Sequence, residues 1–195
     1  MILRKLSLLT LLSVCLSSLS QTSIRLPDII SSGMVLQQQT EVKIWGKATP
    51  GSRISIHTDW TRKDISTEAD ADSTWFLRVT TPKASWHQHV IALRENGNAT
   101  TQVVLSNVLI GEVWFCSGQS NMEMFLNGFG GCPIDGANEE IATAAEWVGR
   151  IRMANVPKTG NTEPQEWVSG CKWNVPDVNT APWMSAAAWH FAKML

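Results

Sequence analysis

The sequence predicts a mixed α/β protein, in which an antiparallel β-sandwich is followed by the first part of an α/β/α layer. Two observations lead to this prediction. Between about residues 24 and 107 the chain is a series of short segments rich in β-branched or alternating residues, separated by turn residues, as in a sandwich. After residue 107 an apolar run, a helical segment and a second short apolar run follow, which is typical of a strand–helix–strand crossover unit.

Six segments of the first region are expected to be strands. The clearest is Arg53 to Thr58, where strict alternation should turn Ile54 and Ile56 toward a core. The expected strands are 34–38, 42–47, 53–58, 75–80, 89–94 and 102–108, with turns at 50–51, 69–73 and 96–98. The histidines of this region, His57, His87 and His89, are interpreted as strand or loop residues and not as catalytic bases. No Cys/His spacing in the chain resembles a zinc site.

The second region should begin with a strand at 108–116, buried on both faces of a parallel sheet. Gly118 then permits a sharp turn, and Ser120 follows at the carboxyl end of the strand, where ligands bind in open α/β sheets. The N-terminus of a following helix would favour a developing oxyanion there. The structural alternative is a Ser/Asn helix cap after a core strand.

Two helices and one further strand are expected beyond this turn. Asn138 should cap a helix whose apolar face includes Ile141, Ala144, Ala145 and Val148. A short strand at 151–156 would complete the crossover unit, and 157–182 should be mainly loop. A final helix begins near Ser185, with an apolar stripe formed by Met184, Ala187, Ala188, Phe191, Ala192 and Leu195.

Charge and hydropathy limit the partners and the compartment. The net charge is −1 and no basic cluster exceeds a short pair, which argues against nucleic acid as the partner. Residues 1–20 are typical of an export signal, with Arg4 and Lys5 before the apolar run from Leu6 to Leu16. No later segment reaches the ~20 apolar residues that a membrane span requires. We therefore expect a secreted or periplasmic protein without a membrane anchor.

Three cysteines follow the signal segment. A disulfide between Cys132 and Cys171 is plausible in an oxidising compartment, although the spacing alone does not fix the pairing. Cys116 should be buried at the end of the 108–116 strand. It is a competing nucleophile, but its expected burial before the turn favours Ser120.

The run Gly-Glu-Val-Trp-Phe-Cys-Ser-Gly-Gln-Ser-Asn-Met-Glu at 111–123 closely resembles the nucleophile block of sialate O-acetylesterases, members of the SGNH-hydrolase superfamily. The similarity extends upstream through 26–38 and 42–46, and downstream through Ile151-Arg152-Met153 and 184–192. The expected organisation is the signal peptide at 1–20, a β-sandwich domain at 21–107 and, as the resemblance implies, an incomplete SGNH-type, flavodoxin-like hydrolase domain at 108–195.

The resemblance also implies a reaction. Ser120 would be the nucleophile that removes O-acetyl groups from sialic acids, with its own backbone N–H as one oxyanion donor. Gly118, Gln119 and Asn121 would line the site, and no metal or other cofactor is implied. The family's base is a histidine in an Asp-x-x-His block near the C-terminus, and no such block occurs here. We therefore expect an N-terminal fragment or truncated product whose catalytic His and Asp lie outside this sequence.

Two other functions fit the sequence. One is deacetylation of acetyl xylan or another polysaccharide, because related SGNH enzymes share the serine block. The other is a non-catalytic or vestigial sugar-binding β module. For both esterase hypotheses, the sialate esterase and the polysaccharide esterase, the partner is an acetylated sugar. The oligomeric state is not predicted.

Overall fold

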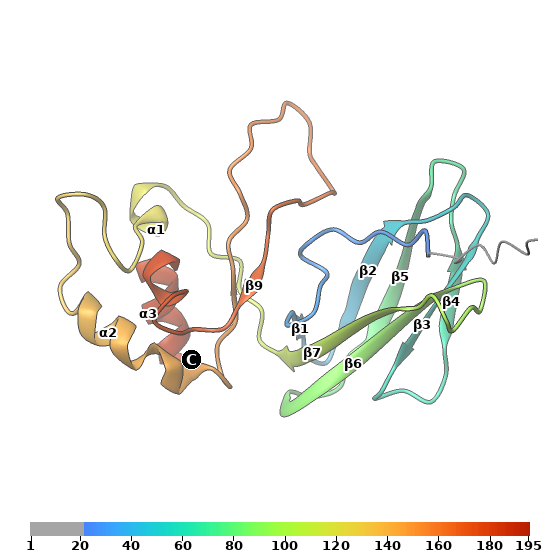
Figure 1. Ribbon diagram of the computed structural model, residues 1–195, viewed down its shortest axis with the longest axis horizontal. Coiled ribbons are helices and arrows are strands. Elements are labelled where there is room, and N and C mark those ends of the chain that lie inside the picture. Colours follow the sequence, from blue (N-terminus) through green and yellow to red (C-terminus); the bar gives the residue numbers. More distant parts are fainter. Residues whose placement is uncertain (1–21) are drawn as a thin grey trace, which may run out of the picture.

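The computed structural model describes residues 22–195 and shows a mixed α/β protein in which most regular structure is strand. The signal segment expected at 1–20 lies outside the described residues. Figure 1 shows strands β1 to β7 on one side of the molecule and the helices on the other. Each side has its own cluster of buried apolar residues.

Seven strands form two sheets in the first region. Five of them are β1 (Val35–Gln37), β3 (Arg53–Thr58), β4 (Ile65–Glu68), β6 (Ser85–Glu95) and β7 (Val103–Gly111), arranged in the order β1-β7-β6-β3-β4. The other two, β2 (Glu41–Lys47) and β5 (Thr74–Thr80), form an antiparallel pair. Within the five-stranded sheet β1 pairs with β7 in parallel, whereas the other neighbours are antiparallel. The six expected strands are all confirmed, and β4 was missed because its sequence is short and polar.

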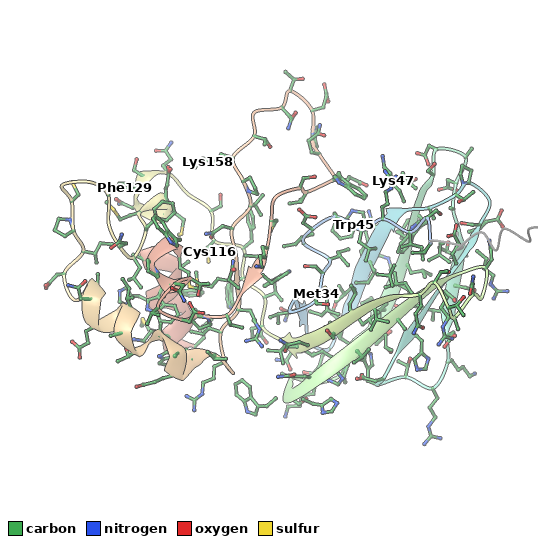
Figure 2. All side chains as sticks on the ribbon, viewed as in Figure 1. Met34, Trp45, Lys47, Cys116, Phe129 and Lys158 are labelled. Atoms are coloured by element: carbon green, nitrogen blue, oxygen red, sulfur yellow. The ribbon has the colours of Figure 1, made fainter. Side chains whose placement is uncertain are left out.

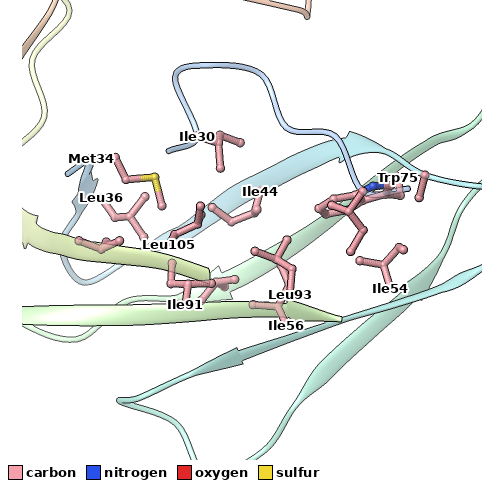
Figure 3. Close-up of a cluster of buried hydrophobic side chains, with 14 of the residues drawn as sticks. Ile30, Met34, Leu36, Ile44, Ile54, Ile56, Trp75, Ile91, Leu93 and Leu105 are labelled. Atoms are coloured by element: carbon pink, nitrogen blue, oxygen red, sulfur yellow. The ribbon is translucent and has the colours of Figure 1, made fainter. Parts of the chain in front are cut away.

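The two sheets of the first region face each other across one core (Figure 3). Ile54 and Ile56 on β3 are fully buried in it, as their alternation predicts. Ile44 of β2 and Trp75 of β5 enter the same core from the opposite sheet. Gly46 permits this packing, because a Cβ atom there would lie 2.3 Å from the Arg25 carbonyl oxygen and 2.9 Å from the Trp75 ring.

The second region is built from short helices around a smaller core. Trp189 is 0% exposed at its centre and packs with Leu126, Ala144 and Ala181. The elements are α1 (Ser120–Glu123), α2 (Ala137–Thr143), the 3-10 helix η1 (Ala144–Trp147), β8 (Met153–Ala154), β9 (Trp173–Asn174), the 3-10 helix η2 (Ala181–Trp183) and α3 (Ala186–Met194).

The strand expected at 108–116 is only partly formed. β7 ends at Gly111, and residues 112–117 have no regular structure. Trp114 is 57% exposed and Phe115 is 87% exposed, so this stretch is not buried on two faces. The physical reason is pairing: in the described part of the chain no strand lies beside 112–117, and an extended segment without a ladder partner is not stable as a strand.

The expected crossover unit is also wrong, because β8 pairs with β9 in an antiparallel ribbon. The helix expected near Asn138 begins at Ala137, and its cap is Gly136 in the left-handed conformation, with φ 73°. Ala145 and Val148 are exposed because the chain tightens into η1, which changes the helical period.

The helix expected near the end of the chain is confirmed as α3, although its buried face differs from the expected stripe. Ser185 caps it and accepts a hydrogen bond from the Ala188 N–H, as predicted. The buried helical residues are Ala186, Ala188 and Trp189, whereas Phe191 is exposed. The apolar periodicity of the sequence therefore predicted the position of the helix but not which of its faces is buried.

The connection from residue 157 to residue 172 returns to the first region (Figure 2). The Trp45 Nε1 donates to the Glu166 carbonyl oxygen at 3.0 Å, and Lys47 Nζ lies 5.6 Å from the centre of the Trp167 ring. The Asp28 carboxylate accepts a bond from the Gly170 N–H at 2.6 Å. These contacts tie the loop to the sheets. Within residues 22–195, no helix has both the length and the apolar character needed to cross a membrane.

Candidate active site

Ser120 lies at the exposed start of α1, directly after the irregular stretch 112–119. Gln119 takes the cap position, and its side chain makes no capping bond. The Ser120 hydroxyl forms no hydrogen bond within residues 22–195. The Ser/Asn cap alternative is therefore not what the structure shows at Ser120, whose hydroxyl is free to react.

Two backbone N–H groups beside this hydroxyl are also free. The N–H groups of Met122 and Glu123 both donate to the Gln119 carbonyl oxygen at 3.0 Å. Those of Ser120 and Asn121 have no acceptor in the part of the chain that the structure describes. They can act as donors to a developing oxyanion. The helix N-terminus was expected to stabilise a developing oxyanion. This stabilisation should be small, because α1 is a single turn of four residues.

The serine turn is held against the N-terminus of α3. Met124 accepts a bond from the Ala186 N–H at 2.8 Å, and the Ser185 hydroxyl donates to the Met122 sulfur at 3.4 Å. A Cβ atom at Gly118 would lie 3.0 Å from the Met122 Cβ, so the predicted turn glycine allows a close approach. An ion pair between Lys158 and Glu123 adds a contact from the long connection.

None of the histidines forms a pair with Ser120 in the described residues. His57 contacts Asp64, and His89 contacts Asp59, each at 2.7 Å in the β-rich region. His190 is exposed on α3. The arrangement therefore contains a serine hydroxyl and two backbone N–H groups without hydrogen-bond partners, and no histidine contacts them among residues 22–195.

The cysteines differ from the sequence-based expectation. Cys116, Cys132 and Cys171 are all free, so the disulfide between Cys132 and Cys171 is not formed. Cys116 is exposed, because the strand that was to bury it ends at Gly111. Burial of Cys116 is therefore no longer a reason to prefer Ser120 as the nucleophile. The preference for Ser120 now depends on its unbonded hydroxyl and the unbonded N–H groups beside it. Burial raises the pKa of the Cys171 thiol, and the charge of Asp28 adds to this effect.

A cavity of about 340 Å³ lies between β6, β7 and the chain after η1, and it does not include Ser120. Trp86, Gln88, Leu109, Arg150 and Arg152 line it, together with Gly149. The Arg152 guanidinium donates to the Asn107 Oδ1 at 3.2 Å, while its Nε has no partner in the described structure. Burial lowers the pKa of Arg152. This cavity could not be predicted from the sequence, since its residues come from separate segments.

A charged contact joins α2 to α3. The Glu140 Oε2 accepts bonds from Lys193 Nζ at 2.5 Å and from the Trp189 Nε1 at 2.8 Å. The bond from Lys193 lowers the pKa of Glu140 most, and the Trp189 N–H lowers it further against the opposing effect of burial. The carboxylate is therefore favoured in the folded state.

Stability should fall in acid because of this contact. A lowered folded-state pKa contributes stability that is fully present above the ordinary value of 4.5 and is lost as the pH falls through the folded-state pKa. At pH 7 Glu140→Gln is expected to lower the free energy of unfolding by about 1–3 kcal/mol, and the difference from the native protein should shrink at pH 3. Urea unfolding at both pH values measures this. Glu139→Gln, at an exposed neighbouring carboxylate, is the control, and an equal effect of both substitutions would contradict the assignment.

The fold resembles that of a known class of enzymes, the carbohydrate acetylesterases. The structure is similar to the crystal structure of a carbohydrate acetylesterase from Xanthomonas citri, with a TM-score of 0.77 and 27% identity over 88% of this chain and 37% of that one. No family model matches the sequence.

The sequence is similar in particular to sialate O-acetylesterases, which confirms the resemblance to this family. It is 26% identical to the Mus musculus protein over 183 residues and 28% identical to the Homo sapiens protein over 184 residues. Each match covers 88% of this chain, and the chain spans about a third of the length of these relatives, 33% and 34% respectively.

Proposed function

We propose that this protein is a carbohydrate esterase that removes O-acetyl groups from sugars, with Ser120 as its nucleophile. The observation that carries the proposal is the free Ser120 hydroxyl beside the free N–H groups of Ser120 and Asn121. The names of the similar proteins support the same reaction class, since all of them are acetylesterases.

The reaction would proceed by acyl transfer in two steps. The Ser120 oxygen attacks the acetyl carbonyl carbon, its proton passes to a base, and the N–H groups of Ser120 and Asn121 stabilise the tetrahedral oxyanion. The sugar oxygen then leaves with a proton, which produces acetyl-Ser120. Water attacks this ester in the second step, releases acetate and restores the hydroxyl. The base is not assigned to a residue, because no described histidine contacts Ser120.

Three residues would shape the site around the nucleophile. Gly118 allows Met122 to close against the turn, and the Gln119 carbonyl oxygen holds the N–H groups of Met122 and Glu123 away from the oxyanion. Asn121 supplies the second free N–H. These contacts support the assignment of Gly118, Gln119 and Asn121 as lining residues.

The finer assignment is an exported sialate O-acetylesterase. The proposed organisation is a signal segment at 1–20, an antiparallel β-sandwich at 21–107 and an SGNH-type α/β/α region at 108–195. The two facing sheets and the separate second core support two regions, although β7 continues the first region to Gly111 and Val108 is buried in the first core. The positive start and apolar run at the N-terminus support export. The sialate O-acetylesterases among its relatives support the substrate, an acetylated sialic acid.

A second candidate is an esterase of acetylated polysaccharides such as acetyl xylan. It is favoured by the solved structure, which is named a carbohydrate acetylesterase without mention of sialic acid. Both candidates use Ser120 in the same way and differ only in the sugar that is bound.

Acetate release from matched substrates tests these proposals. The full-length protein, with the Asp-x-x-His block that the resemblance places outside this sequence, is incubated with an O-acetylated sialic acid, with acetylated xylan and with an aryl acetate, and acetate is measured over time. We expect release from the sialic acid ester and from the aryl acetate. Release from xylan alone among the sugars would favour the second candidate. No release above the buffer rate from any of the three would contradict the esterase and leave a non-catalytic sugar-binding module.

A further inference from the structure

Three metal-ligating side chains meet at one end of the five-stranded sheet, outside the proposed esterase site. They are Asp59, directly after β3, and His87 and His89 on β6. Each offers one ligand atom, and the three atoms lie within 4.8 Å of one another. The esterase reaction uses none of them.

The backbone fixes this cluster. His87 and His89 are two residues apart on β6, and although β6 pairs irregularly with β7 around His89, their ring centres lie 4.7 Å apart. The β3–β6 ladder pairs Thr58 with Ile91, and Asp59 extends it by donating to the Val90 carbonyl oxygen at 3.2 Å. The Asp59 carboxylate accepts a bond from the Val90 N–H at 2.8 Å in return. The carboxylate is therefore held beside the two rings by main-chain contacts.

The three side chains differ in freedom. His89 is buried, and its Nδ1 lies 2.7 Å from the Asp59 Oδ1. Its ring packs edge-on against Trp60, with the ring centres 5.0 Å apart, and against His87 at 4.7 Å. His87 has a side chain that is 68% exposed, with its Nε2 4.0 Å from the Asp59 Oδ2. Two ligands are thus anchored, and the third can rotate toward them.

We propose that Asp59, His87 and His89 bind a divalent transition-metal ion of the zinc class. Imidazole nitrogens select zinc, nickel or copper over magnesium and calcium, which prefer sites built from oxygen alone. Metal–ligand bonds of about 2.0–2.2 Å need donor atoms closer together than 4.8 Å, and rotation of the exposed His87 supplies this closure. The ion would replace the hydrogen bond between His89 and Asp59. With three protein donors, its fourth position would be open to water.

The neighbouring His57 and Asp64 provide a matched comparison. Their Nδ1 and Oδ1 atoms are also 2.7 Å apart, in the same five-stranded region. Among the described residues no third ligand atom joins this pair. The His57–Asp64 pair is therefore an ordinary histidine–carboxylate contact without the geometry of a metal site. Comparing it with the cluster at Asp59 distinguishes a metal site from a simple hydrogen bond.

Calorimetric titration of the tag-free, metal-stripped protein with zinc chloride tests the proposal. We expect one ion per chain at this site. His87→Ala should weaken that binding at least about tenfold, because it removes a ligand, while the exposed position leaves the fold intact. Asp59→Asn and His89→Ala should weaken binding as well, with folding checked by circular dichroism. His57→Ala is the matched control and should bind zinc as the native protein does.

Two outcomes would overturn the site: no saturable zinc binding by the native protein, or binding by His87→Ala with unchanged stoichiometry and affinity. Ser120→Ala should bind zinc normally, since the metal site and the proposed esterase site share no residue. Failure of one proposal therefore leaves the other intact.

Discussion

In the full-length protein, replacing Ser120 by alanine is expected to lower the rate of aryl acetate hydrolysis by at least about a thousandfold, because the hydroxyl oxygen forms the covalent intermediate. Stability should not change, since Ser120 is exposed and its hydroxyl makes no hydrogen bond within residues 22–195. Initial rates and thermal unfolding of the two proteins measure both effects. A large kinetic loss with an unchanged melting temperature would show that the serine acts in the reaction and not in the fold.

The serine turn also provides its own controls. Ser117 is exposed in the same irregular stretch, and Ser117→Ala should retain the native rate. Cys116 is the competing nucleophile and is likewise exposed, so Cys116→Ala should also retain it. Equal turnover by Ser120→Ala and the native protein would disprove the nucleophile assignment. A loss confined to Cys116→Ala would transfer the role to the cysteine.

Replacing Trp189 by alanine is expected to lower the free energy of unfolding by about 3–5 kcal/mol. The side chain is fully buried at the centre of the second core, where its removal leaves a cavity among Leu126, Ala144 and Ala181. The substitution also removes the N–H that donates to Glu140 at 2.8 Å. Urea unfolding measures the loss, and part of it should appear as reduced cooperativity of the helical region.

Trp86 is the control for this substitution because it is 74% exposed on β6. Trp86→Ala should cost less than about 1 kcal/mol, since little of its surface is removed from water. Similar losses for the two tryptophans would contradict the view that Trp189 organises the second core.

The sequence predicted the β-rich region well because strand patterns there are local. The alternation from Arg53 to Thr58 predicted β3 with its buried isoleucines, and the turn residues predicted where strands end. β4 was not predicted, because Ile65–Glu68 has neither a clear alternation of apolar and polar residues nor an apolar run. The same local logic located the cap of α3 at Ser185.

The second region was predicted less well because its structure depends on partners that a pattern does not reveal. The run from Val108 to Cys116 is apolar enough for a buried strand, but only its first part lies beside other strands. The pairing of Met153 with Asn174 joins segments with no shared pattern. The position of Ser120 at the end of the apolar run could be predicted, whereas its exposed approach and free N–H groups could not.

The candidate metal site shows the same limit. His87 and His89 were interpreted separately as strand or loop residues, and Asp59 had no motif of its own. Only the register of β3 against β6 brings the carboxylate to the two rings. The one local signal was the His-x-His spacing on a strand.

The parallel pairing of β1 with β7 has a consequence for the order of folding. β3, β6 and β7 follow one another around the sheet as antiparallel neighbours, whereas β1 joins the edge from the opposite end of the β-rich segment. Closing so long a loop costs entropy before any contact is gained, so β1 should dock after β7 is already in place. Its register sets Gln37 beside Gly111, and the Gln37 side chain then accepts the Val113 N–H at 2.8 Å. The path that leads toward Ser120 would therefore be fixed only in a late folding step.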